Sequence, residues 1–131
     1  MGYSVRWDNE EKTVVLQQYT GKPVKQDLYG LAEESALLLK SVPYRVHLII
    51  DERSIKLALN SEDIQFLEKY VPTNQGAVVT VVASESSLAY KRYIRDVGKK
   101  LAPKAFEQPY YATTVEAARQ LLQGQFSVRY P

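Results

Sequence analysis

The sequence contains no cysteine and a single histidine, His47. Without thiols the chain can form no disulfide and perform no thiolate chemistry, and one imidazole leaves too few ligands for a zinc site. The six glycines are scattered, so the sequence has neither a phosphate-binding loop nor a dinucleotide-binding fingerprint. His47 falls in an apolar stretch that predicts a buried strand, where it has no catalytic partner. We therefore expect no metal, no cofactor and no enzymatic activity.

Long apolar runs are missing as well. The longest, Ala77 to Ala83, is far too short to cross a bilayer, and the first residues, "MGYSVRWDN", lack the apolar centre of a secretion signal. These features predict a cytoplasmic location and no transmembrane segment. The length of 131 residues suits one domain. We expect that domain over residues 1–124, with residues 125–131 as a C-terminal tail.

The apolar pattern alternates between the periods of strands and helices. Tyr3 to Trp7 and Thr13 to Tyr19 flank a turn and predict an antiparallel hairpin, whereas the apolar runs at 44–51 and 76–83 are typical of strands covered on both faces. Helical patterns cover roughly residues 28–40, 61–70, 85–101 and 114–123, and a short strand covers 109–112. This order predicts an α/β fold with a mostly parallel central sheet, an antiparallel N-terminal hairpin and helices packed on the sheet.

Local rules make specific predictions for the C-terminal part. Thr113, with Glu116 three residues later, matches a capping box at the start of the last helix, and Gly124 is placed to end that helix. The tail then reads "FSVRYP", which alternates aromatic or apolar and polar residues as "YSVRW" does near the start. Three interpretations of the tail stay open. The alternation fits any half-buried strand, so the similarity of the two ends can be chance; the tail can add an extra edge strand, in its own subunit or in a neighbour; or the terminus is frayed.

Polar side chains follow the two central strands where these strands end. Ligands of open parallel sheets gather at the carboxyl ends of the strands, and helix N-termini at that edge add backbone N–H groups that favour an anion. The candidate binding residues there are Asp51, Arg53, Ser54, Ser61, Ser84, Ser86 and Ser87. The alternative is that the serines only cap helices.

The helix predicted at 85–101 concentrates positive charge. The segment from Lys91 to Lys104 has six cations and one anion, whereas the rest of the chain has 11 cations and 14 anions. Because the periodicity assigns Tyr93 to the buried stripe of this helix, aromatic rings do not alternate with the cations, which disfavours nucleic acid. The face is either solvated or a contact for acidic lipid or an acidic partner. The basic face comprises Lys91, Arg92, Arg95, Lys99 and Lys100.

Five segments spread over nearly the whole chain match the pattern of a known family. They read "WDNEEKTVVLQQYTG", "DLYGLAEESALLL", "SVPYRVHLIID", "VVTVVAS" and "YYATTVEAARQLL". On these segments the chain resembles the STAS/SpoIIAA-like superfamily, which includes anti-sigma-factor antagonists, and more closely its uncharacterised bacterial branch. The resemblance implies a SpoIIAA-like β-α superhelix. It also implies that Ser61 corresponds to the serine that is phosphorylated in the antagonists, with Asn60 in place of their aspartate.

The resemblance and the charge pattern lead to one expected function and one alternative. The expected function is a non-enzymatic protein-interaction or regulatory domain that self-associates as a homodimer through edge strands. The alternative is a binder or carrier of an apolar, lipid-like or anionic small molecule, with peripheral membrane contact through the basic face. Relatives on this branch look similar to the CRAL-TRIO lipid-carrier architecture, which implies an apolar cavity between sheet and helices. Its candidate lining residues are Leu31, Leu38, Ile55, Leu57, Leu59 and Phe66.

Overall fold

Five strands form one mixed sheet in the order β1-β2-β3-β4-β5. The computed structural model describes residues 2–21, 24–53, 61–83, 92–93, 96, 99–101, 103–104 and 109–130. β1 runs antiparallel to β2, and every other pair of neighbours is parallel. The strands are β1 Tyr3–Trp7, β2 Val14–Tyr19, β3 Val46–Asp51, β4 Gln75–Val81 and β5 Pro109–Ala112. The predicted α/β class, the N-terminal hairpin and the central position of β3 are confirmed.

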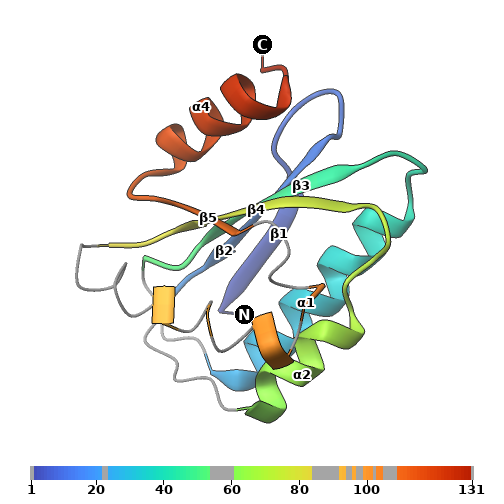
Figure 1. The fold of residues 1–131 in the computed structure, drawn as a ribbon, viewed down its shortest axis with the longest axis vertical. Helices are drawn as coiled ribbons and strands as arrows, with labels where there is room; N and C mark the ends of the chain where they lie inside the picture. Colours follow the sequence, from blue (N-terminus) through green and yellow to red (C-terminus); the bar gives the residue numbers. More distant parts are fainter. Residues whose placement is uncertain are drawn as a thin grey trace.

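Helices cover both faces of this sheet (Figure 1). The helices whose bounds the structure describes are α1 Lys25–Lys40, α2 Ser61–Lys69 and α4 Val115–Phe126. α1 and α2 pack together on one face, and α4 packs on the other. Side chains of the strands alternate accordingly: Leu16 and Ile49 join Leu122 of α4 in one core, and Tyr19 joins Leu28 of α1 in another. β3 reads as a continuous apolar run because both of its faces are covered.

A buried carboxylate joins α1 to α2. Asp63 in the first turn of α2 is almost completely buried. Its Oδ1 accepts a hydrogen bond of 2.6 Å from the Tyr29 hydroxyl, and its Oδ2 lies 3.1 Å from Nζ of Lys25. A buried charge is stable only when it is paired in this way. The contact fixes α2 beside α1, so the two helices together form one wall over the sheet.

The last helix begins one residue later than the capping-box pattern predicts. Thr114, and not Thr113, is the N-cap, and its hydroxyl oxygen accepts a hydrogen bond of 3.0 Å from the Ala117 N–H. The prediction was wrong because two consecutive threonines can each cap a helix, and the spacing to Glu116 favours the first of them.

α4 also ends later than predicted. It continues through Gly124 to Phe126, and Gly124 does not take the positive φ that favours glycine at a helix end. The residue in the left-handed conformation is Ser127, with φ of 56°, and its N–H donates to the carbonyl of Leu122. A non-glycine residue can adopt this conformation at a modest energetic cost when the contacts that follow repay it.

The tail forms no strand over its described residues. Its first two residues complete α4, and the remainder turns back onto its own chain. Val128 is buried in the core on the α4 side, and the Tyr130 hydroxyl donates a hydrogen bond of 2.6 Å to Asp8. Nδ2 of Asn9 donates to the backbone carbonyl of Arg129 at 3.1 Å. Within its own chain the tail therefore adds no edge strand over residues 125–130, because these contacts are made by side chains and a turn and not by a ladder; pairing with a neighbouring subunit stays a prediction.

Candidate functional site

A cavity of about 150 Å³ lies between the sheet and helices α1 and α2. Leu28, Leu31 and Leu39 line it from α1, and Leu48 and Ile50 line it from β3. Side chains from β2, β4, β5 and the C-terminal part of α2 complete the wall. Protein interiors pack like organic crystals and contain few voids larger than a water molecule, so a hollow of this size is a distinct feature. Apolar cavities on the order of 150 Å³ are large enough to bind a benzene-sized molecule.

One polar pair interrupts the apolar wall of this cavity. Gln17 points from β2 toward α1, and its Nε2 donates a hydrogen bond of 2.6 Å to Oγ of Ser35. Both residues line the cavity, and they are only 4% and 5% exposed. Among the described residues no hydrogen-bond donor reaches Oε1 of Gln17, and this oxygen is not sealed from water. The wall therefore contains an amide oxygen that the described protein does not bind.

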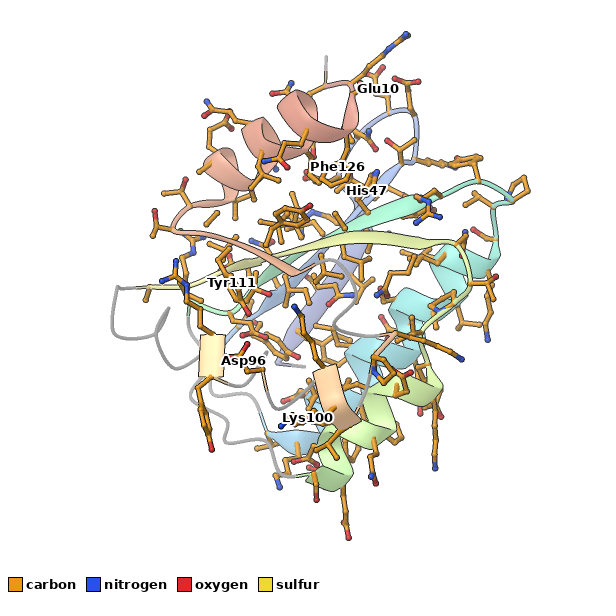
Figure 2. All side chains as sticks on the ribbon, in the orientation of Figure 1. Glu10, His47, Asp96, Lys100, Tyr111 and Phe126 are labelled. Atoms are coloured by element: carbon orange, nitrogen blue, oxygen red, sulfur yellow. The ribbon has the colours of Figure 1, made fainter. Side chains whose placement is uncertain are left out.

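The polar end of the cavity lies at the carboxyl ends of the strands. Tyr19 ends β2, Glu52 follows β3, and Thr80 and Tyr111 come from β4 and β5. Figure 2 shows Tyr111 on the side of the sheet that faces α1 and α2. Burial first, and the nearby Glu52 carboxylate second, raise the pKa of Tyr19 far above its usual value, so its phenol remains neutral. This end of the cavity is consequently lined by the neutral phenol of Tyr19 and by the side chain of Glu52.

The cavity differs in part from the one that the sequence predicts. Leu31 lines it as expected. Leu38 does not, because it packs on the cluster around Leu39 and Val46, and Phe66 does not, because its ring packs between those of Tyr29 and Tyr70. The other expected lining residues, Ile55, Leu57 and Leu59, fall outside the residues that the structure describes.

Sequence reasoning missed the polar residues of the cavity, although two of them carry a signal. Gln17 is one of two adjacent glutamines in β2 and occupies an inward position, and Ser35 interrupts the apolar stripe of α1. Each position alone is compatible with an ordinary core, and only the three-dimensional packing shows that they meet. Glu52 carries no such signal, since it follows Asp51 in a stretch that reads as a polar loop.

Asp51 and Arg53, two of the predicted binding residues, form an ion pair with each other. Nε and Nη2 of Arg53 donate to the Asp51 carboxylate at 2.9 and 2.8 Å, and Nε2 of Gln18 donates at 3.1 Å. Burial by itself would raise the pKa of Asp51, but the hydrogen bonds from Arg53 and Gln18 outweigh it and lower that pKa. An anion that approached Arg53 would have to compete with this carboxylate. A binding role for the pair stays a prediction.

Only one of the predicted serines is in the part of the chain that the structure describes. Ser61 is the first residue of α2 and is exposed, and the acidic residues Glu62 and Asp63 follow it. Their charges would oppose an added phosphate, and phosphorylation of Ser61 stays a prediction. The other four serines lie outside the described residues: Ser54, Ser84, Ser86 and Ser87.

The basic face is seen in part. Arg92, Lys99 and Lys100 are helical and exposed, while Lys91 and Arg95 are outside the described residues. Tyr93 was predicted to be buried, and this is wrong, because its side chain is 64% exposed. Tyr93 and its neighbour Arg92 are both exposed, so one aromatic ring does accompany the cations. Contact of this face with a membrane or a partner stays a prediction.

His47 lies on the other face of the sheet, beside Phe126 and beneath α4 (Figure 2). The ring centroids of His47 and Phe126 are 4.9 Å apart, and Nδ1 of His47 accepts a hydrogen bond of 3.0 Å from the Ala77 N–H. Burial, and secondarily the charge of Arg45, lower the pKa of His47, so the imidazole is neutral. The expected burial of His47 is confirmed. Within the described ranges no group of three or more His, Asp and Glu side chains is arranged to hold a metal ion.

The helices and three comparisons with known proteins bear on what the chain is. None of the helices in the described ranges is both long and apolar enough to span a membrane. Comparison with models of known protein families, with curated proteins and with solved structures gives no match. Arguments about function therefore depend on the cavity and its lining residues.

Proposed function

We propose that this protein binds a small, mostly apolar molecule in the cavity between the sheet and helices α1 and α2, and that it performs no chemistry on it. The observation that supports the proposal is the cavity itself, an apolar hollow of about 150 Å³ with a few polar groups in its wall.

The cavity narrows the class of ligand relative to the lipid-like or anionic molecule expected from the sequence. Pockets for drug-sized ligands typically measure roughly 300–1,000 Å³, and this cavity is smaller, so a long acyl chain fits poorly. Transfer of an ion from water into a mostly apolar cavity is costly, which disfavours an anion. A compact uncharged molecule, about the size of a substituted benzene ring, is the ligand that this cavity favours.

The family assignment and the interaction role remain proposals beside this one. The STAS/SpoIIAA-like assignment is supported by the alternating order of strands and helices and by an antiparallel hairpin on a parallel sheet. A regulatory domain of that kind would act through a protein partner or through a homodimer formed at the free edges of β1 or β5. A measurement of small-molecule binding in the cavity distinguishes the two functions. The binder requires it, and a protein-interaction domain does not.

The test of the proposed function is the melting temperature with and without phenol, in the wild type and in two variants of α1. Ala32 lines the cavity, so Ala32→Phe fills it, whereas Leu37 is 70% exposed on the same helix, so Leu37→Phe leaves the cavity open. A ligand at ten times its Kd stabilises the folded state by about 1.4 kcal/mol, a rise of a few degrees. We expect that rise in the wild type and in Leu37→Phe, and none in Ala32→Phe. No rise in the wild type, or an equal rise in all three proteins, would overturn the proposal.

A further inference from the structure

The position of Gln17 in the cavity wall has a consequence for which ligands can bind. Its amide is held from one side only, because Nε2 donates to Ser35 and Oε1 has no donor among the described residues. The side chain is nearly inaccessible to bulk water, at 4% exposure. Its orientation is fixed by β2 and by the bond to α1, so it cannot swing out to find another donor. The acceptor is presented to whatever occupies the cavity.

A ligand without a hydrogen-bond donor would leave that acceptor unmet. While the cavity is empty or holds water, Oε1 of Gln17 can be hydrated, but a hydrocarbon would displace that water and offer nothing in return. Sites built to hydrogen-bond a ligand discriminate strongly against analogues that lack the group, because a buried polar atom then loses its partner.

We infer that Gln17 is the specificity-determining residue of the cavity, and that the ligand is a small aromatic or aliphatic molecule carrying one O–H or N–H donor. The inference depends on the proposed function, since it concerns the same cavity. The proposed function gives only the size of the ligand, and this inference specifies its polar group. An apolar molecule with one hydrogen-bond donor should bind, and a carboxylate of the same size should not. Phenol, with its hydroxyl on a benzene ring, represents this class.

The experiment measures the dissociation constants of four probes of similar size by NMR titration: phenol, fluorobenzene, toluene and benzoate. Fluorobenzene replaces the hydroxyl of phenol by fluorine and so removes the donor at nearly constant volume. The matched variant is the double substitution Gln17→Met with Ser35→Ala. It removes both members of the polar pair, so no buried partner is stranded and stability should change little. Its melting temperature is the control for folding.

The wild type should bind phenol more tightly than fluorobenzene and toluene, and benzoate least. In the double variant the preference for phenol over fluorobenzene should fall by about tenfold or more, because the phenol hydroxyl then has no acceptor. If the double variant does not fold, the dissociation constants of the four probes for the wild type still show whether the cavity prefers a ligand with a donor. Equal affinities for phenol and fluorobenzene in the wild type would overturn the inference and leave the proposed function intact. Failure of all three uncharged probes to bind would overturn both.

Discussion

Arg119 and Asp8 are 111 positions apart in the sequence and form a bidentate ion pair. Nε and Nη2 of Arg119 lie 3.0 and 2.8 Å from the two carboxylate oxygens of Asp8, which is only 3% exposed. The Tyr130 hydroxyl donates a third hydrogen bond of 2.6 Å to the same carboxylate. One side chain after β1 thus fastens both α4 and the tail to the hairpin.

The first prediction concerns this carboxylate. Asp8→Asn should lower the free energy of unfolding by about 2–3 kcal/mol, because it weakens charge-assisted hydrogen bonds to Arg119 and Tyr130 in a buried place. Urea unfolding measures the change. The control is Glu11→Gln, whose ion pair with Arg129 is longer, at 3.9 Å, and exposed, and which should change stability by less than about 0.5 kcal/mol. Equal unfolding midpoints for wild type and Asp8→Asn would show that the cluster does not stabilise the fold.

The second prediction compares two glycines. A Cβ added at Gly76 would lie 2.5 Å from Nδ1 of His47, so Gly76→Ala should displace the imidazole and destabilise the protein by about 1–3 kcal/mol. A Cβ at Gly124, inside α4, meets nothing within 4 Å, and Gly124→Ala should stabilise by about 0.5–1 kcal/mol. Thermal unfolding should show a lower melting temperature for Gly76→Ala and a higher one for Gly124→Ala than for the wild type. Similar effects of the two substitutions would contradict the described packing around His47.

The third prediction concerns pH. Because the pKa of His47 is lowered in the folded state from its usual 6.5, the unfolded chain binds more protons between those two values, and stability rises with pH there. The contribution is fully present above about pH 6.5, falls as the pH drops toward the lowered value, and is constant below it. His47 is the only histidine in the sequence, so the dependence in this window belongs to it.

The control for this prediction is His47→Asn. Its Oδ1 can accept the Ala77 N–H in place of Nδ1, and the side chain does not titrate. Urea unfolding of this variant between about pH 5 and 7 should show a flatter dependence than that of the wild type. The lowered pKa of Asp51 also reduces stability in acid, but only below its usual value of 3.8. The same slope in both proteins would exclude His47 as the cause.

Much of the fold is predictable from the sequence, because the periodicity of apolar residues sets it. The hairpin follows from the alternation in β1, and the buried positions of β3 and β4 follow from continuous apolar runs. The boundaries of α4 are not predictable in the same way. Thr114 and Ser127 are chosen over Thr113 and Gly124 by contacts that depend on the completed fold, among them the burial of Val128.

The cavity could not be predicted in detail for a different reason. Its volume is the space left after side chains from α1, α2 and four strands have packed, and no local pattern encodes such a remainder. Gln17 and Ser35 are each a polar residue at a position where the pattern predicts an apolar core residue. Their meeting at 2.6 Å depends on how α1 lies across β2.

The central claim is that a small molecule enters the cavity beneath α1 and α2, and methyl-resolved NMR during a titration with phenol tests it most directly. Chemical shifts of the Leu28, Leu31 and Leu67 methyl groups should move together and saturate, because these side chains line the cavity. The Leu122 methyl groups, in the core on the α4 side, should stay in place. Shifts confined to Leu122, or no saturable shifts at all, would contradict the account.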